Sequence, residues 1–187
     1  FGGTLARLSE RLGRPVEATL PAVPHLAEAI ARAVEAWPVR PRVVEGEAAK
    51  FAAFRGAHAA LAASGTVTLE LALAGVPMVV AYKVSKLEEQ LKYVITAPSI
   101  VLANLVIGEN VIPEFLQGAC EPETLSAALA PLCADTPERW RQVAAFERLD
   151  ALMDTGGEAP SERAARIVLE TIARRRQALV SSGLVAT

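Results

Sequence analysis

The sequence predicts an α/β fold, in which helices cover both faces of a parallel sheet and further helices follow toward the C-terminal end. Two patterns predict it: short apolar segments alternate with helical ones over residues 1–121, and residues 122–187 show helical spacing alone. Strands joined by helices form parallel sheets through right-handed crossovers. The composition agrees, because 52% of the residues are hydrophobic and only 5% are aromatic, with Ala, Leu and Val supplying the apolar surface.

The first elements are predicted as a helix, a strand and a second helix. Residues 4–12 place apolar side chains at helical spacing with charges between them, and Gly13 and Pro15 then end the helix. A strand is expected over residues 16–23. Residues 24–37 carry apolar side chains on one helical face and are predicted as a helix.

Strands and helices continue to alternate through the middle of the chain. In order, the sequence predicts a strand over 42–44, a helix over 48–55 ended by Gly56, a strand over 59–63, a helix over 66–74, a strand over 78–84, an amphipathic helix over 86–95 and a strand over 99–102. Three C-terminal helices are expected over 123–132, 137–152 and 161–178. We therefore expect one sheet domain over residues 1–121, with the helices of 122–187 following it.

Charge and composition exclude several classes of function. The net charge of -2 gives no basic field for nucleic acid. Cys120 and Cys133 have no metal-binding spacing and are expected to be free thiols, with a disulfide between them as the alternative. The uncharged run over 94–108 is too short to span a bilayer. The chain begins with Phe1 and no Met, so we expect a fragment of a longer protein.

The turn Ser64-Gly65-Thr66 is the most informative motif of the chain. It joins a small-residue strand to a helix, where free backbone N–H groups and hydroxyls form a ready site for an anion such as a phosphate. Glu70 lies one turn later, and helical side chains lean back toward the N-terminus. Its carboxylate can accept hydrogen bonds from a ribose diol, so the motif suggests a nucleoside diphosphate. An ordinary helix cap explains the same spacing, and spacing alone leaves both interpretations open.

Two blocks of the sequence resemble a known family. Ser64-Gly-Thr-x-Thr-Leu-Glu70, followed by Ala-Gly75-x-Pro77-Met-Val-Val, is similar to the donor-site signature of GT-B glycosyltransferases. Ile100-Val-Leu-Ala-Asn104 through Pro113-Glu114-Phe-Leu-Gln117 resembles a segment of the lipid-A-disaccharide synthase family, with Ala103 where that family often has Pro. The resemblance covers about residues 1–172 and implies a Rossmann-like sheet, the C-terminal half of a GT-B fold.

The resemblance, together with the motif, implies a nucleotide-sugar site at the C-terminal edge of the sheet. Asn104 is expected to end the last strand there, although a loop residue that bonds its own backbone is the alternative. The backbone of the loop at Glu45 and Gly46 is implied to touch the base. The residues expected to bind the donor are Ser64, Gly65, Thr66, Thr68, Glu70, Asn104, Glu45, Gly46 and Gln117.

The resemblance also implies a reaction. The full enzyme would transfer 2,3-diacylglucosamine from UDP-2,3-diacylglucosamine to 2,3-diacylglucosamine 1-phosphate with inversion, and would release UDP. The base is implied to lie in a missing N-terminal half, so no catalytic residue is expected in this chain, and the fragment alone is expected to be inactive. Asp-x-Asp does not occur, so a metal-independent route is expected, with no cofactor.

The expected partners are a UDP-sugar donor, a lipid-linked glucosamine acceptor and a membrane surface, with a homo-oligomer possible and no nucleic acid. The resemblance implies a cytoplasmic protein, peripheral on the inner face of the bacterial inner membrane. Two other classes stay open. One is a different UDP-sugar enzyme, such as a UDP-N-acetylglucosamine epimerase or a peptidoglycan glycosyltransferase, against which the block from Asn104 to Gln117 speaks. The other is a non-catalytic Rossmann-like interaction module.

Overall fold

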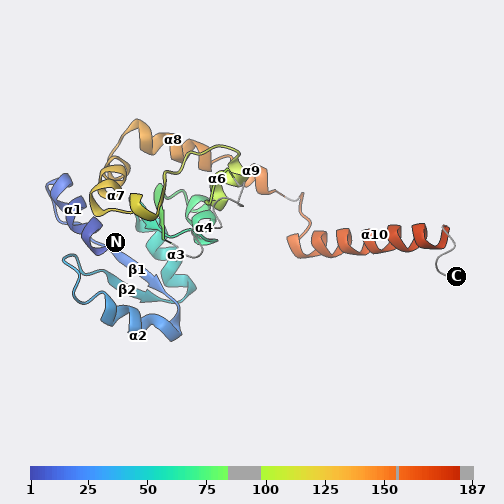
Figure 1. Ribbon diagram of the computed structural model, residues 1–187, viewed down its shortest axis with the longest axis horizontal. Coiled ribbons are helices and arrows are strands. Elements are labelled where there is room, and N and C mark those ends of the chain that lie inside the picture. The colour runs from blue at the N-terminus through green and yellow to red at the C-terminus, as the bar shows by residue number, and fades with distance from the viewer. Residues whose placement is uncertain (84–97, 155, 182–187) are drawn as a thin grey trace. The chain divides into compact units, whose positions relative to one another are not determined.

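A computed structural model describes residues 1–83, 98–154 and 156–181, with side chains placed as far as residue 177. The chain forms two compact units, Phe1–Leu152 and Met153–Thr187. The first unit holds all the described strands and the helices that cover them (Figure 1). The second unit contains one long helix.

The first unit begins with a two-stranded parallel sheet and three helices. Their bounds are α1 Gly2–Leu12, β1 Thr19–Ala22, α2 Pro24–Ala33, β2 Arg42–Glu45 and α3 Glu47–Gly56. β1 and β2 pair in register, with Leu20 opposite Val43. The predicted order of elements over this part is confirmed, and α1 ends as expected at Gly13, whose φ of 63° places it in the left-handed region.

A three-stranded parallel sheet follows, in the order β3-β4-β5. Its strands and the neighbouring helices are β3 Ala60–Ala62, α4 Val67–Leu73, β4 Met78–Tyr82, α6 Leu102–Ile107, β5 Glu114–Leu116, the 3₁₀ turns η2 Gln117–Ala119 and η3 Ala130–Cys133, α7 Pro122–Leu129, α8 Pro137–Phe146 and α9 Leu149–Met153. The described strands therefore divide between two parallel sheets.

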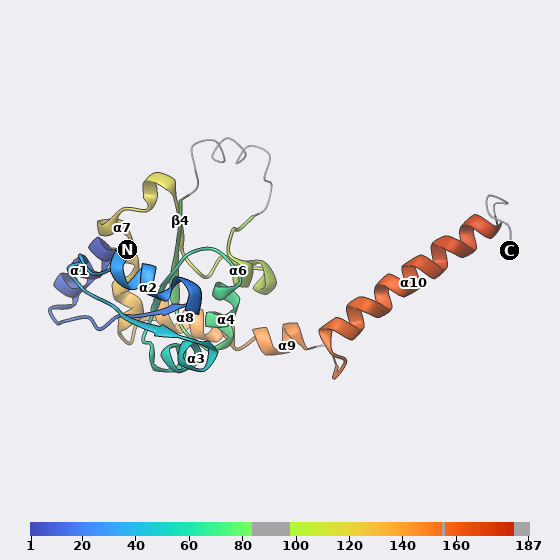
Figure 2. The ribbon, with the colours of Figure 1, turned by 90° about the horizontal axis from the view of Figure 1, so that it is seen from below.

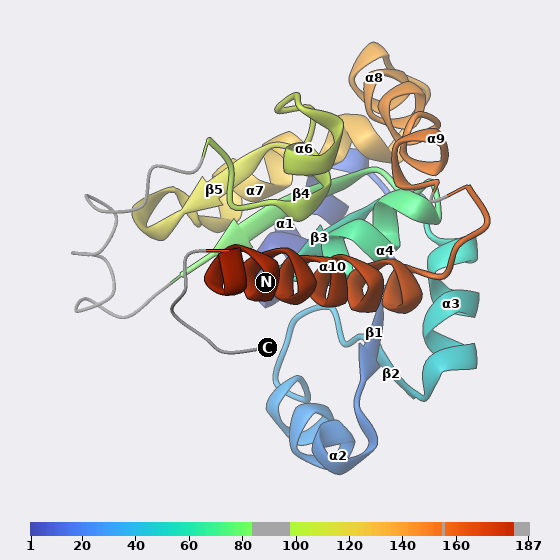
Figure 3. The same ribbon diagram turned by 90° about the vertical axis from the view of Figure 1, so that its right-hand side faces the viewer.

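β4 is the centre of the core. Successive side chains of a strand point to opposite faces. Met78 and Val80 accordingly join a cluster that includes Leu71 of α4 and Ile107 of α6. Val79 joins a second cluster, which holds Leu8 of α1 and Leu125 and Leu129 of α7. Helices thus cover both faces of this strand, as the α/β prediction requires (Figure 3).

The strand predicted over 99–102 is wrong, because the chain is a loop from residue 98 to 101 and α6 begins at Leu102. The Ser99 hydroxyl accepts from the Val101 N–H at 2.9 Å, and the Glu114 carboxylate accepts from the Ile100 N–H at 3.0 Å. Side chains therefore occupy backbone donors that a strand would pair with a neighbour. The third strand of the sheet is β5, a three-residue segment that the sequence analysis missed.

The C-terminal helices broadly match their predictions. The single helix expected over 137–152 is two helices, α8 and α9, with Glu147 and Arg148 between them. The helix expected over 161–178 is α10, Pro160–Ser181 (Figure 2). The helix predicted over 86–95 lies outside the described residues. Within the described part of the chain, no helix is long and apolar enough to cross a membrane.

Candidate functional site

The candidate site lies at the C-terminal edge of the three-stranded sheet. β3 and β5 are both parallel to β4, so the residues that follow them emerge at the same edge. Ser64 comes two residues after the end of β3, and Gln117 comes directly after the end of β5. Ligands of parallel α/β sheets bind at this edge. Glu45 ends β2 in the other sheet.

The turn Ser64-Gly65-Thr66 presents backbone at the protein surface. Gly65 has a φ of 150°, and an added Cβ would meet no atom within 4 Å, so backbone conformation and not space favours glycine there. Thr66 is the N-cap residue of α4, and its carbonyl accepts from the N–H of Glu70 at 3.2 Å. Gly65 and Thr66 are both exposed. Their backbone is therefore open to a ligand.

Two hydroxyls hold this turn in place. Thr68 is 0% exposed, and its Oγ1 donates to the Gly65 carbonyl at 2.8 Å. The hydroxyl of half-buried Ser64 donates to the Ile100 carbonyl at 2.7 Å, which ties the turn to the loop before α6. Of the predicted donor-binding residues, Thr68 is therefore buried and stabilises the turn from within the protein. Ser64 also stabilises the turn, but its side chain is partly exposed.

Glu70 forms an ion pair that the sequence analysis missed. Its Oε2 lies 2.9 Å from Nζ of Lys50 on α3, and the two side chains are 36% and 25% exposed, respectively. Lys50 stands one turn after Gly46, whose carbonyl accepts its backbone N–H at 3.0 Å. The pair thereby brings the first turns of α3 and α4 together. The signal that could have found Lys50 is its place one turn after Gly46, the glycine that directly follows a strand.

The loop at Glu45 and Gly46 is exposed, as a ligand-binding loop must be. Gly46 is the N-cap residue of α3, with φ 85° and ψ 161°. This region of backbone conformation is essentially restricted to glycine. Because the ion pair joins α3 to α4, this loop and the Ser64-Gly65-Thr66 turn precede helices whose first turns are in contact.

Asn104 lies inside α6 and does not end a strand, so that part of its prediction is wrong. Asn104 is only 2% exposed, and its side chain makes four hydrogen bonds. Oδ1 accepts from the backbone N–H groups of Val111 and Ile112, and Nδ2 donates to the Ile112 carbonyl and to Glu114. The amide therefore uses its bonding capacity within the protein.

Glu114 connects Asn104 to the surface turn and was also missed. Its carboxylate accepts from Asn104 Nδ2 at 2.8 Å, from the Ile100 N–H at 3.0 Å and from the Ser99 hydroxyl. Ile100 in turn accepts from Ser64. A continuous chain of hydrogen bonds thus runs from α6 to the turn. Glu114 stands in the second sequence block, directly after Pro113, and its presence in that block is the one signal that could have drawn attention to it.

Gln117 has an unusual backbone conformation. Its φ is 49°, and it is the one non-glycine residue of positive φ in the described part of the chain. Such a conformation costs a residue with a side chain about 1 kcal/mol or more and concentrates at functional sites. The place of Gln117 at the end of β5 is consistent with its predicted role, which stays a prediction.

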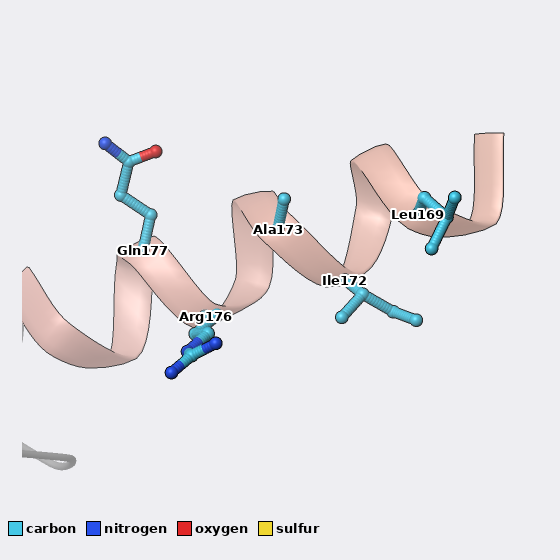
Figure 4. A pocket seen from close by; sticks show the side chains of 5 residues that line it. All are labelled: Leu169, Ile172, Ala173, Arg176 and Gln177. Carbon is cyan, nitrogen blue, oxygen red and sulfur yellow. The ribbon is translucent and has the colours of Figure 1, made fainter. Parts of the chain in front are cut away.

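Other features of the described residues do not contribute to this site. No group of three or more His, Cys, Asp and Glu residues there could hold a metal ion. Burial raises the pKa of the Cys133 thiol above its ordinary value, which makes it a poor nucleophile at neutral pH. A shallow groove on α10 is lined by side chains of that one helix, Leu169, Ile172, Ala173, Arg176 and Gln177 (Figure 4). It shares no residue with the candidate site.

Comparison with known proteins gives one consistent family. Residues 4–168 match the family model described as lipid-A-disaccharide synthetase. The chain is 54% identical over 178 residues to a lipid-A-disaccharide synthase of Bradyrhizobium diazoefficiens, covering 95% of this chain and 45% of that protein. It is 56% identical over 173 residues to that of Nitrobacter hamburgensis (92% and 43%), and 38% identical over 176 residues to that of Rhodospirillum centenum (94% and 44%). The chain therefore spans less than half the length of these relatives.

Proposed function

This chain belongs to the lipid-A-disaccharide synthetase family, and on that premise we propose that it is the donor-binding part of an inverting, metal-independent GT-B glycosyltransferase. The whole protein would transfer 2,3-diacylglucosamine from UDP-2,3-diacylglucosamine to 2,3-diacylglucosamine 1-phosphate. The products are the lipid A disaccharide and UDP. The base that activates the acceptor hydroxyl would lie outside this chain.

One observation carries the proposal: an exposed glycine turn and a carboxylate lie one helical turn apart at the C-terminal edge of the sheet. Backbone N–H groups at a helix start bind phosphate oxygens and would stabilise the negative charge of the departing diphosphate. The Glu70 carboxylate accepts hydrogen bonds and suits a ribose diol. The two groups thus match the two polar ends of a uridine diphosphate.

Within this proposal the predicted residues have two kinds of role. Thr68 and Asn104 are positioning residues, because their polar groups bond within the protein and both are buried. The remaining predicted residues would contact the donor, with Glu45 and Gly46 at the base and Gln117 beside the strand end. The contact residues are Ser64, Gly65, Thr66, Glu70, Glu45, Gly46 and Gln117.

The partners and location follow from the same proposal. The donor would be bound by residues 1–121, and the helices of 122–187 would pack on that domain or cross to the rest of the protein. The acceptor is a lipid-linked glucosamine phosphate. Because such an acceptor is anchored in a bilayer by its acyl chains, the enzyme would work at the cytoplasmic face of the inner membrane as a peripheral protein. The proposal also allows a homo-oligomer.

The test is a transfer assay on the full-length protein with both lipid substrates, in which mass spectrometry follows the disaccharide and UDP together. We expect equal amounts of the two products, and an unchanged rate after EDTA treatment, since the proposal assigns the leaving group to backbone N–H groups. Absence of the disaccharide would overturn the proposed reaction. A rate lost in EDTA and restored by magnesium would overturn the metal-independent route.

A further inference from the structure

We propose that Lys50 is a positioning residue, which holds the Glu70 carboxylate in place to accept hydrogen bonds from the ribose diol of the donor. This inference rests on the proposed function and deepens it, because it names the residue that orders one contact of the site. The family blocks in the sequence do not include Lys50. Its role comes from the geometry that joins α3 to α4.

The ion pair between Lys50 and Glu70 differs from the other ion pairs of the described residues. Its 2.9 Å separation joins side chains that are 25% and 36% exposed, whereas the Arg32–Glu28 pair on α2 is 69% and 84% exposed. Solvent screening is weaker at a half-buried pair. The Lys50 ammonium also lies 4.6 Å from the centroid of the Phe51 ring, a cation–π contact that further restricts it.

Lys50 and Glu70 occupy equivalent places on their helices. The Lys50 N–H donates to the carbonyl of Gly46, and the Glu70 N–H donates to the carbonyl of Thr66. Each side chain therefore projects from the first turn of a helix that follows a predicted ligand-binding loop. Lys50 belongs to α3, so its ion pair fixes the Glu70 side chain relative to a second helix. A residue of α4 could not provide that link.

The two oxygens of the Glu70 carboxylate have different roles in this proposal. Oε2 accepts from Lys50, and Oε1, which accepts no hydrogen bond from any residue that the structure describes, would accept from the diol. A carboxylate oxygen has two lone pairs, so it can accept from both hydroxyls of a diol. Without Lys50, Glu70 would sample several rotamers, and the protein would lose diol recognition while the Ser64-Gly65-Thr66 turn still met the diphosphate.

The experiment compares the binding of UDP and 2′,3′-dideoxy-UDP to the full-length protein by calorimetry. The variants are Lys50→Met, which removes the charge and keeps the apolar stem, Lys50→Arg, which keeps the charge, and Glu70→Gln. Arg32→Met is the matched control, since it removes the cation of an exposed pair far from the site in sequence. Thermal melting checks folding, and Lys50→Gln replaces Lys50→Met if the latter does not fold.

We expect the unaltered protein and Arg32→Met to prefer UDP over the dideoxy compound by about tenfold or more. In Lys50→Met the preference should fall to about threefold or less, Lys50→Arg should restore most of it, and adding Glu70→Gln to Lys50→Met should cause little further loss. If the Lys50→Met protein keeps the full preference for UDP, the inference is overturned, even if both nucleotides bind more weakly. Lys50 would then either contact the diphosphate or only join α3 to α4. Failure of the unaltered protein to bind UDP would instead overturn the proposed function itself.

Discussion

At the residue scale, buried polar side chains hold the exposed ones in place. Asn104 bonds to both the N–H and the carbonyl of Ile112, and Glu114 links it to Ile100 and from there to Ser64. Removing one member of such a network leaves buried donors without acceptors, which costs more than the bond itself contributed. The integrity of the surface turn therefore depends on a residue that the proposed donor would not touch.

Asn104→Ala should consequently destabilise the protein by about 2–4 kcal/mol, because the buried Ile112 N–H loses its acceptor and the Ile112 carbonyl and the Glu114 carboxylate each lose a donor. The Val111 N–H keeps its bond to the Glu109 carbonyl. Asn110→Ala is the matched control. Asn110 is exposed and makes a 3.4 Å hydrogen bond to the Pro98 carbonyl, so its loss should cost under about 0.5 kcal/mol. Urea unfolding of the full-length variants measures both values. Equal stability of the two variants would show that the Asn104 network contributes little.

Sequence reasoning recognises the chemistry of residues better than their orientation. Thr68 and Glu70 stand two positions apart on α4, so they point in different directions, Thr68 inward and Glu70 toward α3. A motif lists both without distinguishing them. Lys50 and Glu114 were missed for a related reason: each bonds to a residue ten or more positions away, and the local sequence does not specify that partner.

At the scale of elements, helices and strands could be predicted where the periodicity was strong and turn residues marked the ends. Hydrogen bonds from side chains to the backbone could not be predicted from the sequence. The apolar run from Met78 to Tyr82 begins directly after Gly75-Val76-Pro77 and forms a strand as predicted, which is the central one of its sheet. Residues 100–102 are also apolar, yet the Ser99 hydroxyl and the Glu114 carboxylate bond the backbone there and hold it as a loop. The actual third strand, β5, has three residues and is too short to show alternation.

The start of α3 gives a test at this scale. Gly46 has φ 85° and ψ 161°, which a residue with a Cβ adopts only under strain, so Gly46→Ala should destabilise the protein by about 1–3 kcal/mol and displace the first turn that carries Lys50. Gly56→Ala, at the other end of α3, is the control: it has open space and no positive φ, and should be neutral or stabilising by up to about 1 kcal/mol. Thermal unfolding of the two variants compares them directly. A Gly46→Ala protein as stable as Gly56→Ala would contradict the assigned backbone role.

At the scale of the molecule, the two sheets, their helices and the proposed donor contacts belong to the unit Phe1–Leu152. The α/β class and the helices on both faces could be predicted, because strands and helices alternate regularly over this unit. The division of the described strands into two sheets could not, since β2 and β3 are joined through α3 and nothing local in the sequence specifies which strands pair. The helix α10 was predictable from the spacing of its apolar residues alone.

The last prediction concerns the 187 residues as a catalyst. Glycosyl transfer requires that donor and acceptor be held together in one orientation, and this positioning supplies a large share of the rate. The proposed donor contacts lie within this chain, but the chain covers only 45% of its Bradyrhizobium relative, and the base is expected elsewhere. The purified chain should therefore form no disaccharide in an assay where the full-length protein does, with mass spectrometry as the readout. Product formed by the chain, and lost on Glu70→Ala, would contradict this division of labour, since donor site, base and acceptor surface would then all lie within one half.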